Sequence, residues 1–84
     1  MERVIITIKI ENIDEEYDFD IPSDITSKIL IEKLIRIFSV KSIALSKTLR
    51  YVLKIDFQNR ILKANETLNE AGVWDGSILT LIKC

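Results

Sequence analysis

Side chains that could do chemistry are few in this chain. It contains no histidine, and its one cysteine, Cys84, is the final residue. A nucleophilic or metal-bound cysteine works beside a base or with further ligands, and histidine is the usual partner in both roles. We therefore expect neither histidine-based catalysis nor a metal site, and we interpret Cys84 as an incidental free thiol.

Acidic residues are the other group that could act chemically. Asp14, Glu15 and Glu16 are consecutive, and clustered carboxylates bind hard cations such as calcium. This stretch lacks the alternating ligands and the glycine of a calcium-binding loop, so a solvated turn is the better interpretation. The two glycines, Gly72 and Gly76, fit no phosphate-binding pattern. We predict that the protein uses no cofactor and is not an enzyme.

Charge is distributed unevenly along the chain, although the net charge is only −1. An acidic block runs from Glu11 to Asp24, and the region from Lys28 to Lys63 is predominantly basic. Such a dipole is either an ordinary solvated surface or a means of steering a charged partner. The basic residues are neither clustered nor interleaved with aromatic ones, so we expect no nucleic-acid partner.

Composition is that of a small folded domain. The 84 residues are 48% hydrophobic and rich in isoleucine, which suffices for one core over residues 1–84. No apolar run approaches the roughly 20 residues of a membrane-spanning helix, and the first residues do not form a signal peptide. A single cysteine allows no internal disulfide. We expect a cytoplasmic protein that reaches a membrane only through a partner.

One stretch, Ile25–Phe38, has the spacing of an amphipathic helix. At about 100° per residue, its apolar side chains form one wide stripe and its charged side chains lie opposite. Two isoleucines depart from this division, because Ile29 falls on the polar side and Ile35 on its margin. The stripe consists of Leu30, Ile31, Leu34, Ile37 and Phe38.

Alternating apolar residues predict strands before and after this helix. The polar stretch Glu11–Glu16 would form the first turn, and Pro22 would end the second strand because it has no backbone donor. In the last strand, Leu79 and Leu81 would face the core. The predicted strands are Arg3–Ile10, Tyr17–Ile21, Leu49–Ile55, Ile61–Leu62 and Ser77–Lys83.

The connections carry recognisable turn residues. Asn65–Leu68 resembles a capped single turn, which Gly72 would close in a left-handed conformation. Asp75-Gly76 predicts a tight turn before the last strand. The stretch between residues 39 and 48 has no period, and three of its apolar residues would hold it against the core: Val40, Ile43 and Leu45.

The predicted order is strand, strand, helix, strand, short strand, short turn and strand. This is the order of the β-grasp, an α+β fold in which the first and last strands run side by side in the middle of the sheet. We therefore expect a mixed sheet of about four to five strands with one helix packed across it.

With these elements assigned, the chain resembles ubiquitin. The similarity is carried by Ile21-Pro22-Ser23-Asp24 before the helix and by the closing segment from Leu68 to Leu81, which contains Ala71-Gly72-Val73-Trp74-Asp75-Gly76-Ser77. Among ubiquitin-like proteins, the chain is most similar to the YukD-like family, small bacterial proteins of type VII secretion clusters. The resemblance implies a single ubiquitin-like domain with protein partners in the secretion machinery.

The end of the sequence departs from ubiquitin. Conjugation requires a flexible tail ending in Gly-Gly, because the terminal carboxylate must enter narrow enzyme channels to be adenylated and transferred. This chain ends Leu81-Ile82-Lys83-Cys84, which predicts a terminus held in a strand. We expect neither conjugation nor sulfur-carrier activity.

The expected function is that of a non-enzymatic interaction module. The resemblance implies a cytosolic accessory or regulatory component of type VII protein secretion. The alternative is a regulatory or scaffold ubiquitin-like domain of a larger chain, with an intramolecular role. An exposed helix edge would also permit a weak homodimer.

Four candidate contact residues belong to the face of the predicted sheet away from the helix: Val52, Lys54, Thr80 and Ile82. Strand phase puts Ile5 and Ile78 on the same side, with Lys9 and Arg50 around them. In ubiquitin the corresponding surface is the main partner-binding site, and here threonine replaces its histidine. An apolar centre with a basic rim would provide affinity and orientation. The alternative is that these residues serve strand propensity alone.

Two further candidates lie outside that face. Ile29 is either a tolerated exposed residue or part of a partner-binding helix edge. Trp74 points outward if Val73 faces the core, and an exposed indole is useful in an interface. The alternative is that the indole folds back over the edge of the core.

Overall fold

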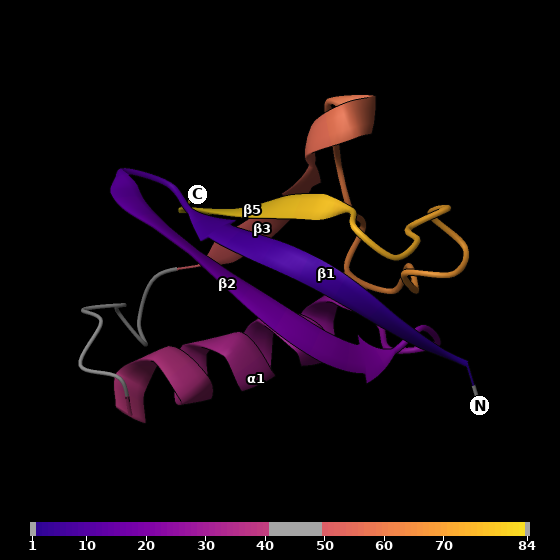
Figure 1. The fold of residues 1–84 in the computed structure, drawn as a ribbon, viewed down its shortest axis with the longest axis horizontal. Coiled ribbons are helices and arrows are strands. Elements are labelled where there is room, and N and C mark those ends of the chain that lie inside the picture. The colour runs from indigo at the N-terminus through magenta and orange to yellow at the C-terminus, as the bar shows by residue number, and fades with distance from the viewer. Residues whose placement is uncertain (1, 41–49, 84) are drawn as a thin grey trace.

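In the computed structural model, one helix lies across one face of a five-stranded sheet in the described part of the chain, residues 2–40 and 50–83 (Figure 1). A short 3-10 helix, η1, follows the third strand. The elements in chain order are β1 (Arg3–Ile10), β2 (Ile13–Pro22), α1 (Ser27–Val40), β3 (Tyr51–Ile55), η1 (Asp56–Gln58), β4 (Arg60–Ile61) and β5 (Ile78–Lys83).

The sheet has the strand order β2-β1-β5-β3-β4. Its central pair, β1 and β5, is parallel, whereas β1 with β2, β3 with β5 and β3 with β4 are antiparallel. The first and last strands therefore run side by side in a mixed sheet, which confirms the predicted β-grasp.

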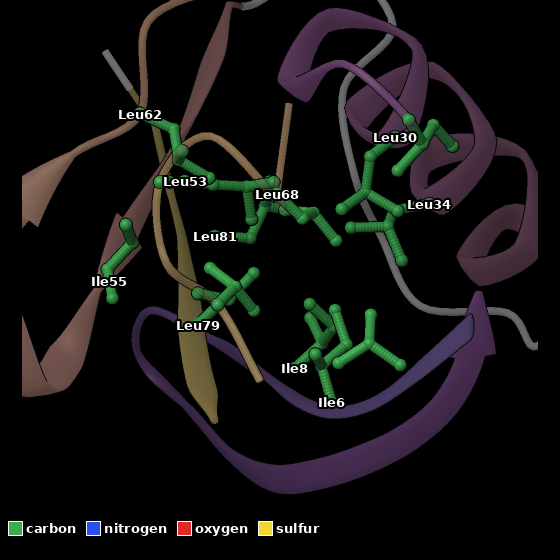
Figure 2. Close-up of a cluster of buried hydrophobic side chains, with 14 of the residues drawn as sticks. Ile6, Ile8, Leu30, Leu34, Leu53, Ile55, Leu62, Leu68, Leu79 and Leu81 are labelled. Carbon is green, nitrogen blue, oxygen red and sulfur yellow. The ribbon is translucent and has the colours of Figure 1, made fainter. Parts of the chain in front are cut away.

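The core lies between α1 and the facing side of the sheet (Figure 2). Alternation in β1 buries Val4, Ile6, Ile8 and Ile10, and the same period buries two residues each in β3 and β5. From α1, Leu30, Leu34 and Phe38 join the cluster, as their helical spacing predicts. Among the labelled side chains of Figure 2, those of β1, β5 and α1, together with Leu53 of β3, surround one centre.

The helix starts two residues later than its apolar spacing predicts. Residues before Ser27 pair with a distant segment instead, since Ser27 N donates to Glu66 O at 3.0 Å and Leu68 N donates to Ile25 O at 3.2 Å. The Thr26 hydroxyl accepts a bond from Ile29 N at 3.4 Å, at the position of an N-cap. Ile25 is buried, so its side chain belongs to the core although its backbone is not helical.

Val40 does not hold the following connection against the core. It is the last residue of α1 and is 83% exposed, so this prediction is wrong, because the helix continues through Val40 and turns its side chain to solvent. The predictions for Ile43, Leu45 and Leu49 lie outside the described residues.

The first turn is shorter than the polar stretch predicts. It occupies Glu11 and Asn12, with Asn12 at a φ of 69°, a left-handed conformation that asparagine tolerates. β2 then begins at Ile13, which packs against the core. The prediction of a turn over Glu11–Glu16 is therefore wrong, because cross-strand pairing extends through the acidic residues.

A capped turn precedes β5, shifted from its predicted position. Thr67 Oγ1 accepts a bond from Glu70 N at 3.0 Å, and Glu70 Oε1 accepts one from Thr67 N at 2.9 Å, so the cap is Thr67 and not Asn65. Gly72 has a φ of 75° and Gly76 a φ of 89°, which confirms both predicted turns. The predicted strand at residues 61–62 is observed at Arg60–Ile61, and Leu62 is buried in the core.

Leu30→Ala and Ile29→Ala together test which side of α1 faces the core. Leu30 is 2% exposed and Ile29 is 45% exposed. We expect Leu30→Ala to lower the free energy of unfolding by about 2–5 kcal/mol and Ile29→Ala by less than about 1 kcal/mol. Urea denaturation measures both. Equal losses would contradict the observed helix orientation.

Glu66 should make stability depend on acidity. Two hydrogen bonds from Arg60, together with the Lys63 N–H, lower the pKa of Glu66 below its ordinary value of 4.5. Stability from the carboxylate is therefore present above about pH 4.5 and is lost as the pH falls through the lowered pKa. The stability advantage of the wild type over Glu66→Gln should shrink between about pH 6 and about pH 3. Arg60→Gln removes the main cause of the lowered pKa, so the stability advantage of the wild type over Arg60→Gln should also shrink as the pH falls over this range. A stability advantage that does not change with pH would contradict the ion pair.

Candidate protein-interaction surface

The side of the sheet away from α1, here called the far face, carries four of the candidate contact residues. Val52 pairs with Ile82, and Lys54 pairs with Thr80. Each alternates with a buried neighbour such as Leu53 or Leu81, so their side chains point away from the core. All four are partly exposed. Cross-strand pairing therefore brings the predicted residues together.

Thr80 lies at the centre of the far face, between two lysines. In the register of the sheet, Thr80 pairs with Lys9 on β1 and with Lys54 on β3. The Thr80 hydroxyl donates to Asp56 Oδ1 at 2.7 Å, which fixes the side chain and uses its only proton. A binding partner would consequently meet a threonine whose hydroxyl retains acceptor capacity only.

Acidic side chains line the β2 side of the far face. Register pairs Glu16 with Lys9, Asp18 with Thr7 and Asp20 with Ile5. Lys9 Nζ is 3.6 Å from Glu16 Oε1, and Thr7 Oγ1 is 2.7 Å from Asp18 Oδ1. The rim is therefore basic toward β3 and acidic toward β2, which corrects the prediction of a basic rim. The sequence analysis placed Glu16 in a turn. Strand phase assigns a side of the sheet only to strand residues, so Glu16 could not be assigned to the far face.

The helix candidate, Ile29, belongs to a different layer of the fold from the strand residues of the far face. Ile29 lies on α1, which covers the opposite side of the sheet (Figure 1). Ile35 instead lines a groove of about 530 Å³ with Ile31 and Leu62, and Val52 of the far face reaches the β3 side of the same groove. The other large exposed apolar residue of α1, Val40, is about 16 Å further along the helix axis. These residues do not form one apolar edge.

Trp74 points outward, as its strand phase predicts. Its side chain is 60% exposed and packs against Phe57, with ring centroids 4.6 Å apart and an interplanar angle of 32°. The ring therefore does not fold back over the core. Phe57 was not among the predicted contacts, because alternation continued from Ile55 would turn it inward. The 3-10 turn after β3 breaks that alternation and leaves Phe57 48% exposed.

Within residues 2–40 and 50–83, no group of three or more histidine, cysteine or acidic side chains is arranged to hold a metal ion. In the same residues, α1 falls short of the length and apolarity that crossing a bilayer requires.

Sequence comparison assigns the family. Residues 4–81 match the family described as "WXG100 protein secretion system (Wss), protein YukD". The chain belongs to the YukD family. The resemblance that the closing segment and the helix entry suggested is thereby confirmed. A search of curated protein sequences finds no match to this YukD-family chain.

Several solved structures have the same fold as this chain. The EccD5 ubiquitin-like domain from Mycobacterium xenopi superposes with a TM-score of 0.82 at 19% identity, covering 100% of this chain and 97% of that one. The ubiquitin-like domain of the Mycobacterium tuberculosis type VII secretion protein EccD1 gives 0.75 at 21% identity, covering 98% and 99%. A chain of the MycP5-free ESX-5 inner membrane complex gives 0.80 at 13% identity, with 100% of this chain and 21% of that chain covered. The YukD-family chain thus has a ubiquitin-like β-grasp fold.

Fluorescence of Trp74 tests its exposure, because it is the only tryptophan. With 60% of the side chain exposed, the isolated protein should emit at the long wavelengths typical of a solvated indole. Phe57→Leu should move the maximum further to the red by removing the neighbouring ring, and Phe38→Leu, in the core, should not. Emission at short wavelength from the folded wild type would show that the indole is covered.

Proposed function

We propose that this YukD-family chain is a non-enzymatic interaction module that docks on components of a type VII secretion system through the far face of its sheet. The observation that carries the proposal is the paired, partly exposed Val52 and Ile82 beside Lys54 and Thr80. The description of the family to which the chain belongs names a protein secretion system, which supports this proposal.

The chemistry of the far face suits recognition of a protein. Val52 and Ile82 lie beside Thr80 in one direction along the strands and Ile78 lies beside it in the other, and desolvation of these apolar side chains gives affinity. Lys9 and Lys54 flank Thr80 on opposite sides, and the acidic row of β2 lies beyond Lys9. This asymmetry would orient a partner of opposite charge pattern and raise its association rate. The steering function suggested by the uneven sequence charge would therefore act through this face.

The similar structures support partners in the secretion machinery. Two are ubiquitin-like domains of EccD proteins, and one chain belongs to an ESX-5 inner membrane complex. By analogy, the chain acts on the cytoplasmic side of that machinery, without covalent conjugation.

The large size of that ESX-5 chain favours a second candidate function. This chain corresponds to only 21% of it, so a ubiquitin-like domain of the same fold occurs there within a longer polypeptide. The second candidate is therefore a regulatory or scaffold domain whose docking is intramolecular. In that case the far face would contact another part of the same polypeptide.

Val52→Lys and Ile82→Lys test the far face. Both side chains are already partly exposed, so each substitution should lower stability by about 1 kcal/mol or less. Each should abolish capture of inner-membrane type VII components from a lysate of a secreting bacterium, measured by pull-down and mass spectrometry. Ile29→Asp, on the opposite side of the molecule, is the matched control and should retain them.

Two outcomes would contradict this assignment. Retention of every partner by both lysine variants would exclude the far face, and loss only in Ile29→Asp would move the contact to α1. If the wild type captured only proteins that have no part in secretion, the proposed function itself would be contradicted.

A further inference from the structure

A small pocket opens where η1 meets the turn before β5. It has a volume of about 400 Å³. Two segments distant in sequence form it, residues 56–57 and residues 74–78, because η1 follows β3 and β3 pairs with β5. Its lining residues are Asp56, Phe57, Trp74, Gly76, Ser77 and Ile78.

Two aromatic rings form one wall of the pocket. Phe57 and Trp74 pack against each other with centroids 4.6 Å apart, yet they remain 48% and 60% exposed. Exposed aromatic rings in contact are unusual for a small domain, since single exposed apolar residues are more common. The exposed π-surface of such a pair attracts cations.

The turn that carries Trp74 is held firmly by hydrogen bonds. Trp74 N donates to Ser77 Oγ at 3.0 Å, and Ser77 N donates to Trp74 O at 3.0 Å. Ile5 N donates to Asp75 Oδ1 at 2.8 Å, and Gly76 N donates to Ile5 O at 2.8 Å. The indole is therefore mounted on a rigid support, which lowers the entropy cost of binding.

Carboxylates supply negative charge at the same place. Asp56 lines the pocket, and its Oδ1 accepts the Thr80 hydroxyl at 2.7 Å, which fixes its orientation. Asp75 is adjacent to Trp74 in the chain. The ion pairs within the described residues are Arg3 with Asp20, Lys9 with Glu16 and Arg60 with Glu66. Neither Asp56 nor Asp75 is thus neutralised by a cation of the described chain.

We propose that this pocket binds an arginine side chain of a partner protein. A guanidinium is planar, so it can stack on Trp74 or Phe57 while its N–H groups donate to the Asp56 carboxylate. Ile78 provides apolar contact for the arginine methylenes. This specificity goes beyond the proposed secretion function and does not depend on it, since it concerns the chemistry of one pocket.

An NMR titration with a capped Gly-Arg-Gly peptide tests the proposal. The single tryptophan gives one indole N–H resonance, which reports directly on the pocket. The matched control peptide has citrulline, which has the same shape without the charge. We expect a saturable shift, with about five- to tenfold tighter binding of the arginine peptide, from combined cation–π and ion-pair attraction.

Two protein variants complete the test. Asp56→Asn removes the charge but retains an oxygen to accept the Thr80 hydroxyl, so it should reduce the preference for arginine to less than about twofold. Glu32→Gln, which removes one carboxylate from the exposed surface of α1, should leave the preference unchanged. Equal affinity for the two peptides in the wild type would overturn the proposal. A shift of the indole resonance with protein concentration alone, in the absence of peptide, would instead identify a second copy of the chain as the occupant and would also overturn it.

Discussion

The parallel pairing of β1 with β5 is the constraint on which the rest of the structure depends. It joins residues about 70 positions apart, such as Thr7 and Ile78, so the chain must close a long loop before this contact can form. Burial on one side offsets that entropy cost, because Ile8 and Leu79 are adjacent in register and fully buried beneath α1. Once β1 and β5 are paired, β2 can pair with the free edge of β1 and β3 can pair with the free edge of β5.

The same pairing determines the character of the far face. Thr80 has Lys9 on one side and Lys54 on the other only because β5 lies between β1 and β3. No two of these three residues are neighbours in sequence. Their proximity, and the acidic row contributed by β2, turns a nearly neutral chain into a surface with basic and acidic halves.

One hydrogen bond connects the far face with the aromatic pocket. Thr80 belongs to the centre of the far face and Asp56 to the pocket, and the hydroxyl of the first donates to the carboxylate of the second. Ile78 also contributes to both. A ligand in the pocket and a protein on the sheet would therefore contact one continuous, rigidly supported surface, and a partner large enough could use the two together.

Periodicity in the sequence determined which side chains form the core and the order of the elements. The spacing of Leu30, Leu34 and Phe38, and the alternation in β1 and β5, follow from local geometry alone, so the β-grasp and the outward direction of Val52 and Ile82 were predictable. The residues at which helices and strands begin and end, and the side of the sheet on which the charged residues lie, were decided only by the tertiary structure. Thr26 and Ile25 stay outside the helix because Thr26 forms a bridge with Thr67 and Ile25 O accepts a bond from Leu68 N, and β2 includes Glu16 because β1 lies beside it. Phe57 meets Trp74 only because β3 and β5 are adjacent. A single sequence contains no signal for such contacts, since they depend on which distant backbone groups satisfy each other.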